Sequence, residues 1–225
     1  MKMAKFSDIK GFVFDLDGVI TDTSIFHSQA WHQVADKVGA PWSKELEDGL
    51  KGISRMDSLE MILKAGNLQD KYTDDQKVDL ATEKNTNYLK LVDQMTPDNI
   101  LPGIKAFLDE IKNGGYLLSL ASASKNAPKV LQKLNLTDYF PKIVDPKTLS
   151  KGKPDPEIYL KGAELIDLKP EQCIGVEDAA AGVESINAAG ETSIGIGDQT
   201  ILKAADIHFA DTSEMTLANI EKQMN

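Results

Sequence analysis

The chain has 225 residues, enough for one α/β domain with or without a smaller second unit, and enough to bury a core without disulfides or a structural metal. Its 25 basic and 35 acidic side chains give a formal net charge of −10, which opposes broad binding to nucleic acids and anionic membranes. The single cysteine, Cys173, excludes an internal disulfide, and no apolar stretch is long enough for a signal peptide or a membrane span. We therefore expect a cytoplasmic protein with no nucleic-acid and no membrane partner.

Five short apolar runs predict the strands of a parallel sheet. Each run is bounded by polar or turn-forming residues, and continuous apolar runs of this length are typical of strands that are buried on both faces. The predicted strands are residues 9–14, 116–121, 173–176, 193–196 and 207–210. Because helical patterns separate these runs, the sequence indicates parallel strands joined by crossover helices.

Helical signals follow the strands from about residue 101 onward. A one-face apolar stripe runs from Ile104 to Ile111 and ends at Gly114-Gly115. Asp155-Pro156 predicts another helix start, with the aspartate as N-cap and the proline at the first helical position. A third stripe begins at Ala180 and ends at Gly190. The alternation of strands and helices predicts an α/β protein with a Rossmann-like, doubly wound parallel sheet.

Residues 23–95 break this alternation, because only helical patterns occur there. Apolar residues at helical spacing precede Gly39 and Gly66, and a long helical stretch covers about residues 73–92. We interpret this region as an all-helical domain inserted after the first strand. The predicted division is a core of residues 1–22 and 96–225 and a helical cap of residues 23–95, with hinges near Asp22 and Thr96-Pro97.

Polar side chains follow three of the predicted strands at the point where each strand ends. Asp15, Ser122 and Asp178 occupy these positions. In an open parallel sheet, ligands bind beyond the carboxyl ends of the strands, so we expect the three residues to converge. Each of them alone has an ordinary structural explanation, as a solvated turn, a turn former or a helix cap.

Four carboxylates near these strand ends favour a metal site. Asp15 and Asp17 are two residues apart, so an extended chain would place both side chains on one face. Close carboxylates repel each other unless a cation or a proton relieves them, and Glu177 and Asp178 add to the charge. Hard oxygen ligands that leave room for phosphate oxygens suit Mg²⁺. Lys153, in the rigid loop Lys153-Pro154-Asp155-Pro156, can neutralise a phosphoryl group, although a lone lysine is usually a surface residue. The sequence thus predicts a Mg²⁺ site with a lysine that can neutralise a phosphoryl group.

These segments together resemble the haloacid dehalogenase superfamily of phosphotransferases, over essentially the whole chain and in the order of that family. The matching segments are Asp15-Leu16-Asp17-Gly18-Val19, Ser122, Lys153-Pro154-Asp155-Pro156, and Gly175-Val176-Glu177-Asp178 with Ala181-Gly182. The resemblance implies that Asp15 is the nucleophile that becomes an aspartyl phosphate. It implies that Asp17 is the general acid and base, and that Asp15, Asp17, Glu177 and Asp178 hold Mg²⁺. Ser122 and Lys153 would hold the transferring phosphate.

Within the superfamily, the chain resembles enzymes that interconvert β-D-glucose 1-phosphate and glucose 6-phosphate through a 1,6-bisphosphate. The resemblance rests on the segments 50–55, 57–58 and 121–126, and on Asp22-Thr23 with His27 and Trp31. It implies that Thr23 and His27 orient Asp17 and respond to cap closure. The implied substrate-binding residues on the cap are Lys51, Gly52, Ile53, Ser54, Arg55 and Ser58. Those on the core are Ser122, Ala123, Ser124, Lys125 and Asn126, of which the last three would share a second phosphate with Arg55.

Three other functions remain to be weighed. A sugar-phosphate phosphatase of the same superfamily would use the same Asp15 and Asp17, so only the cap and the segment 124–126 favour a mutase. A phosphate-sensing protein or a receiver module would need neither the helical insert nor a second acid. Dehalogenase chemistry needs a nucleophilic aspartate but no carboxyl group to protonate a sugar oxygen. We expect a monomer that acts on small sugar phosphates.

Overall fold

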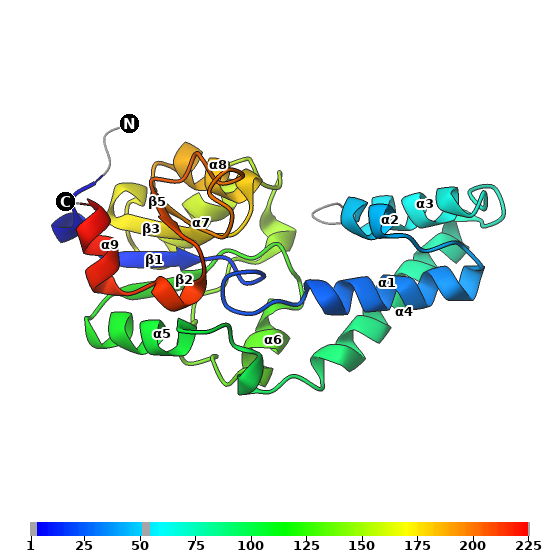
Figure 1. The fold of residues 1–225 in the computed structure, drawn as a ribbon, viewed down its shortest axis with the longest axis horizontal. Coiled ribbons are helices and arrows are strands. Elements are labelled where there is room, and N and C mark those ends of the chain that lie inside the picture. Colours follow the sequence, from blue (N-terminus) through cyan, green and yellow to red (C-terminus); the bar gives the residue numbers. More distant parts are fainter. Residues whose placement is uncertain (1–3, 51–54, 225) are drawn as a thin grey trace. The chain divides into compact units, whose positions relative to one another are not determined.

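The computed structural model describes residues 4–50 and 55–224. The chain divides into two compact units, Met1–Asp22 with Met95–Asn225, and Thr23–Gln94. We call the first the sheet unit and the second the helical unit (Figure 1). Across the described part of the chain, no helix combines the length and apolar character needed to cross a bilayer.

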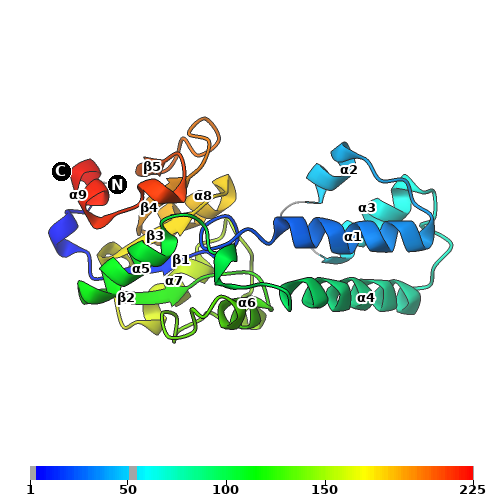
Figure 2. The same cartoon turned by 60° about the horizontal axis from the view of Figure 1, so that its bottom comes forward.

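A five-stranded parallel sheet forms the centre of the sheet unit, and its strand order is β2-β1-β3-β4-β5 (Figure 2). The strands are β1 (Gly11–Phe14), β2 (Leu117–Leu120), β3 (Cys173–Glu177), β4 (Thr192–Ile196) and β5 (Ile207–Phe209). Phe14, at the end of β1, is in register with Leu120 of β2 and Val176 of β3. The chain order reverses between β1 and β3, which is the switch point where doubly wound folds bind ligands. The predicted fold class is therefore confirmed.

Helices cover both faces of this sheet. The helices of the sheet unit are α5 (Ile104–Asn113), α6 (Ala127–Lys133), α7 (Glu157–Leu165), α8 (Ala180–Ala189) and α9 (Leu217–Met224). On one face, α7 packs on β1 and β2, while α8 packs on β3 and β4. On the other face, Phe107 of α5 contacts Phe12 and Phe14 with ring centroids 5.6 and 6.2 Å apart. Burial on both faces explains why the strands read as continuous apolar runs.

The start of α7 differs by one residue from the prediction. The helix begins at Glu157, and Pro156 is its N-cap rather than its first residue. Asp155 nevertheless acts on the helix start, because its Oδ1 accepts a hydrogen bond of 3.1 Å from the Glu157 N–H. The Asp155 side chain therefore accepts a hydrogen bond from the first turn of the helix, although it lies one residue before the N-cap.

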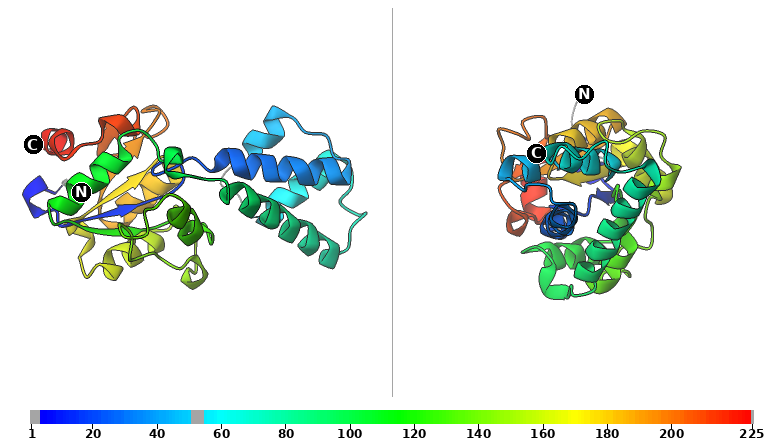
Figure 3. Two further views of the ribbon diagram at one scale, coloured as in Figure 1. Left: turned by 90° about the horizontal axis from the view of Figure 1, so that it is seen from below. Right: turned by 90° about the vertical axis from the view of Figure 1, so that its right-hand side faces the viewer.

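The helical unit consists of four helices among its described residues: α1 (Ser24–Val38), α2 (Lys44–Gly49), α3 (Arg55–Ala65) and α4 (Asp74–Val92). α1 and α4 lie side by side (Figure 3). Its core contains Trp31, Val34, Leu59, Ile62 and Leu63, all buried. Thr73 begins α4 with a capping box, in which its hydroxyl and the Gln76 side chain each bond the other's backbone N–H.

Candidate active site

Asp15 lies directly after β1, at the interior of the sheet. Its backbone N–H donates to the carbonyl oxygen of Val176 in β3 at 3.0 Å, and the carbonyl of the preceding Phe14 accepts from Ala121 at 2.7 Å. These bonds fix the end of β1 to the ends of both neighbouring strands. The polar residues that follow β2 and β3 are thereby brought next to Asp15, as the strand pattern predicted.

The turn after Asp15 passes close to Asp178. Gly18 has a φ of +73°, a conformation that favours glycine, and its N–H donates to the Thr21 carbonyl at 2.8 Å. A Cβ atom on Gly18 would stand 1.9 Å from Oδ2 of Asp178. A side chain at this position would therefore displace the Asp178 carboxylate, so the glycine is required for the approach of the two loops.

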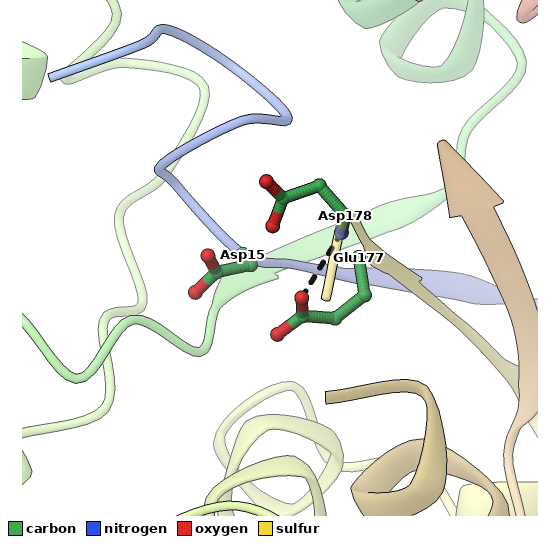
Figure 4. A group of neighbouring side chains, drawn as sticks. All are labelled: Asp15, Glu177 and Asp178. Carbon is green, nitrogen blue, oxygen red and sulfur yellow. Dashed lines mark hydrogen bonds between the residues drawn. The ribbon is translucent and has the colours of Figure 1, made fainter. Parts of the chain in front are cut away.

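Three carboxylates converge at the ends of β1 and β3 (Figure 4). Asp15, Glu177 and Asp178 each offer an oxygen atom within 4.8 Å of those of the other two. Asp15 and Glu177 are buried, whereas Asp178 is exposed. Oε2 of Glu177 accepts hydrogen bonds from the N–H groups of Asp178 at 3.0 Å and Ala179 at 3.1 Å, which fixes the start of the loop. The cluster has the donor chemistry of a site for a divalent cation.

Lys153 connects two of these carboxylates. Its Nζ donates to Oδ1 of Asp15 at 2.9 Å and also to Oε1 of Glu177. Burial by itself would lower the pKa of Lys153, but the charges of Asp15 and Glu177 outweigh that effect and raise it. Lys153 is therefore a cation beside Asp15.

Two acidic residues of the site have raised pKa values, chiefly because their carboxyl groups are shielded from water. Burial raises the pKa of Asp15 to about 8, with Glu177 and Asp17 adding to the effect and Lys153 opposing it. Asp178 is exposed as a residue, but the protein atoms around its carboxyl group shield it from water and raise its pKa to about 7, again with contributions from Glu177 and Asp17. Asp17, which is half-buried, thus acts electrostatically on both residues. A bound cation would relieve this repulsion and favour the ionised forms.

Tyr159 of α7 also belongs to this network, and the sequence analysis did not identify it. The side chain is fully buried, and its hydroxyl donates to Oε1 of Glu177 at 3.1 Å. Nζ of Lys153 lies 5.2 Å from the centroid of the tyrosine ring. In the sequence, Tyr159 is indistinguishable from the apolar residues beside it, because its position fits a helix packed on the sheet.

The segment after β2 forms a polar loop that leads into α6. Ser122 is buried, and its hydroxyl accepts from the N–H of Ser124 at 3.2 Å. The hydroxyl of Ser124 in turn accepts from the N–H of Asn126 at 3.3 Å. Ala123 and Lys125 are exposed. These bonds hold the loop in a compact form beside the end of β1.

A cavity of about 540 Å³ adjoins the site within the sheet unit. Its lining includes Gly18, Asp178, the turn Leu101-Pro102 before α5, and the segments at the ends of β4 and β5. Its walls are mainly apolar, with Asp198 and Asp211 among the lining residues. Both of these carboxylates are already used by local N–H and hydroxyl groups, as caps of the turns that they begin.

The remaining predicted site residues belong to the helical unit and are described within it. Thr23 is buried, and its hydroxyl accepts from Tyr88 at 3.3 Å. Ser58 is buried in α3, and Arg55 donates to Oδ1 of Asn85 at 2.9 Å. The predicted residues Lys51, Gly52, Ile53 and Ser54 lie outside the described residues.

His27 pairs with a buried lysine that the sequence analysis did not single out. Nδ1 of His27 lies 2.6 Å from Nζ of Lys84, and the imidazole packs on Tyr88 with centroids 4.2 Å apart. Burial lowers the pKa of His27 to about 3, with Lys84 and Arg55 adding to the effect. Burial and Arg55 lower the pKa of Lys84 to about 7. The imidazole is therefore neutral, and a protonated Lys84 can donate to its Nδ1. Lys84 was detectable in principle, since it shares a helix face with Leu80 and Tyr88 at intervals of four residues.

Comparisons with known proteins agree on one family. Residues 9–190 match the haloacid dehalogenase-like hydrolase family. The chain is 43% identical to the β-phosphoglucomutase of Bacillus subtilis (strain 168), covering 96% of this chain and 95% of the relative. A crystal structure of β-phosphoglucomutase from Clostridium difficile superposes with a TM-score of 0.87 at 42% identity, covering 96% of this chain and 97% of that one. A phosphorylated-carbohydrate phosphatase from Thermotoga maritima is 29% identical, covering 81% of this chain and 82% of that protein.

Proposed function

This chain belongs to the haloacid dehalogenase-like hydrolase family, and we infer that it is a hexose phosphate mutase that interconverts β-D-glucose 1-phosphate and glucose 6-phosphate. The observation that carries this conclusion is the 43% identity with a β-phosphoglucomutase over 96% of the chain. The phosphatase among its relatives is more distant, at 29% identity over 81% of the chain. The mutase function is therefore favoured over the phosphatase alternative.

We propose that Asp15 attacks the phosphorus atom of the substrate and carries the phosphoryl group as an aspartyl phosphate. The attacking carboxylate must be ionised, and the adjacent ammonium of Lys153, 2.9 Å from Oδ1, favours that form. Lys153 is also placed to neutralise charge on the transferring phosphoryl group. Ser122, at the end of the neighbouring strand, would hold one of its oxygens.

A divalent cation fits the acidic cluster, and we propose that it is Mg²⁺. Asp15, Glu177 and Asp178 supply hard oxygen atoms within 4.8 Å of one another, and Asp17 adds the fourth predicted ligand. When bound, the ion neutralises charge on the phosphoryl oxygens and on the carboxylates around them. The Glu177 and Asp17 carboxylates add to the effect of burial in raising the pKa values of Asp15 and Asp178, and a bound cation would offset that repulsion.

A mutase must also protonate and deprotonate sugar oxygens, and we assign this work to Asp17. It first accepts a proton from the sugar hydroxyl that attacks the aspartyl phosphate, and it later protonates the sugar oxygen that departs when Asp15 attacks the other phosphate of the bisphosphate. The product of the first transfer in the mutase cycle is a β-glucose 1,6-bisphosphate, which must rebind with its two phosphates exchanged. Thr23 and His27 are proposed to orient Asp17, as members of the buried cluster with Tyr88 and Lys84.

The exchange of phosphates requires a second phosphate site, for which we propose Arg55, Ser124, Lys125 and Asn126. A guanidinium can bind a phosphate through two parallel hydrogen bonds, which suits Arg55 to this role. Ala123, in the same loop, would contact the substrate as well. For contacts with the sugar, the proposed residues are Lys51, Gly52, Ile53, Ser54 and Ser58.

We propose that the helical unit acts as a mobile cap on the sheet unit, with hinges near Asp22 and Thr96-Pro97. A closed cap would exclude water, which otherwise hydrolyses an aspartyl phosphate. The proposed protein is a cytoplasmic monomer that binds no nucleic acid, in keeping with its net charge of −10.

The test is a coupled assay that separates the mutase from the phosphatase. Purified protein receives β-glucose 1-phosphate, Mg²⁺ and a trace of the 1,6-bisphosphate, and glucose 6-phosphate and free phosphate are measured together. We expect glucose 6-phosphate to dominate, and Asp15→Asn to abolish its formation while the circular dichroism spectrum stays unchanged. Free phosphate as the main product would refute the mutase and favour the phosphatase.

A further inference from the structure

Glu177 is the most heavily hydrogen-bonded carboxylate of the site. Its Oε2 accepts the N–H groups of Asp178 and Ala179, and its Oε1 accepts both Lys153 Nζ and the Tyr159 hydroxyl. A carboxylate has about four acceptor positions in all. Four donors thus bind the Glu177 carboxylate, and Tyr159 supplies the one uncharged side-chain donor among them.

Glu177 and Asp15 both accept a hydrogen bond from the ammonium group of Lys153, and Tyr159 affects the balance between these two bonds. Nζ of Lys153 contacts Oδ1 of Asp15 at 2.9 Å and Oε1 of Glu177, which is the same oxygen that Tyr159 bonds. The side chains of Lys153, Asp15 and Glu177 are largely or fully buried, so water screens their interactions only weakly. Without the hydroxyl, Glu177 would depend more heavily on Lys153, and the ammonium would move away from Asp15.

We propose that Tyr159 is a positioning residue, whose hydroxyl takes up part of the Glu177 charge and so keeps Lys153 beside the nucleophile Asp15. The ring of Tyr159 contributes a second constraint, since it forms a wall 5.2 Å from Nζ and limits where the ammonium can move. The proposal rests on the proposed function, because the benefit of this placement is charge neutralisation during phosphoryl transfer.

The alternative is that Tyr159 only fills space. It does belong to the buried cluster with Val13, Ile158 and Ala163 on the α7 side of the sheet. A phenylalanine would fill the same space equally well, but it would leave one acceptor position of Glu177 empty. Tyr159→Phe therefore separates the role of the hydroxyl from the role of the ring.

The chain provides a matched control in Tyr139. Its hydroxyl also donates to a carboxylate, that of Asp109 in α5, and its ring lies near the ammonium groups of Lys105 and Lys112. Tyr139→Phe thus removes the same kind of hydrogen bond from the same sheet unit, but outside the network of Asp15, Lys153 and Glu177.

Two measurements test the proposal. In the coupled mutase assay, we expect Tyr159→Phe to lower kcat about tenfold, equivalent to about 1.4 kcal/mol in the barrier, and to change KM for β-glucose 1-phosphate less than about twofold. The second measurement is the binding of trifluoroberyllate, an analogue of the aspartyl phosphate, followed by fluorine NMR in the presence of Mg²⁺. We expect its affinity for Tyr159→Phe to fall about tenfold, and Tyr139→Phe to match the wild type in both measurements.

The proposal is overturned if Tyr159→Phe keeps both kcat and trifluoroberyllate affinity within about twofold of the wild type, whatever its melting temperature. An equal loss in Tyr139→Phe would overturn it as well, because the effect would then not depend on Glu177. A wild-type protein that forms no glucose 6-phosphate would refute the proposed function alone. The trifluoroberyllate comparison would still decide whether Tyr159 positions Lys153.

Discussion

Glu191, which lies outside the acidic cluster, offers a direct test of the energetics of the core. It immediately precedes β4, is 4% exposed, and neither of its carboxylate oxygens has a hydrogen-bond partner among the described residues. The register of β3 and β4, in which Ile174 pairs with Thr192, places it beside the buried thiol of Cys173. Nothing in the described surroundings compensates this buried carboxyl group.

The expected gain from Glu191→Met follows from this lack of partners. Methionine keeps the length of the side chain and removes two polar atoms whose burial without partners costs about 1–3 kcal/mol. We therefore expect the free energy of unfolding at pH 7 to rise by about that amount. For a chain of this size, each kcal/mol corresponds to about 2–4 °C in the melting temperature.

The pH dependence has a definite sign. Burial raises the pKa of Glu191 well above its usual range, so the folded protein retains a proton that the unfolded chain loses above about pH 4.3. The free energy of unfolding is therefore highest, with respect to Glu191, below that pH. It falls progressively as the pH rises toward the folded-state pKa of Glu191. The advantage of Glu191→Met should accordingly grow between pH 5 and pH 8.

Urea unfolding at several pH values measures both effects. Glu191→Gln is the matched variant, because it keeps polar atoms at the site but cannot ionise, and it should remove the pH dependence with a smaller gain in stability. The reasoning is refuted if Glu191→Met is less stable than the wild type at pH 7, or if its advantage is the same at pH 5 and pH 8.

Two further predictions concern the loops around the site. Gly18→Ala should weaken Mg²⁺ affinity about tenfold or more, because its Cβ would displace the Asp178 carboxylate; titration calorimetry would show this, and unchanged affinity would contradict the close approach. Arg55→Ala should lower mutase turnover far more than the hydrolysis of a small phosphate ester such as p-nitrophenyl phosphate, since only the mutase needs a second phosphate site. Equal losses of both activities would rule out that role for Arg55.

The strand ends of the site could be predicted from the sequence because of a general property of parallel sheets. Once 9–14, 116–121 and 173–176 are identified as parallel strands, their carboxyl ends must meet at one edge, and so must Asp15, Ser122 and Asp178. This argument needs no knowledge of side-chain positions. It therefore succeeded for the residues that directly follow strands.

Residues that act through helix packing could not be predicted in this way. Tyr159 reaches Glu177 because of the way α7 packs on the sheet, and the apolar pattern of α7 does not determine that packing. The short helices α2, α6 and α9 were likewise absent from the prediction, since six to eight residues give too little periodicity for a helix to be distinguished.

The position of Asp15 on an interior strand has a mechanical consequence. The Phe14 carbonyl accepts a hydrogen bond from Ala121 after β2, and the Asp15 N–H donates one to Val176 of β3. Hydrogen bonds to both neighbouring strands therefore hold this stretch of backbone. In the proposed mechanism, the substrate and the surrounding loops would therefore move during turnover, while the sheet holds the backbone of Asp15 in place. As the proposed nucleophile, Asp15 would then be the fixed point of the catalytic cycle.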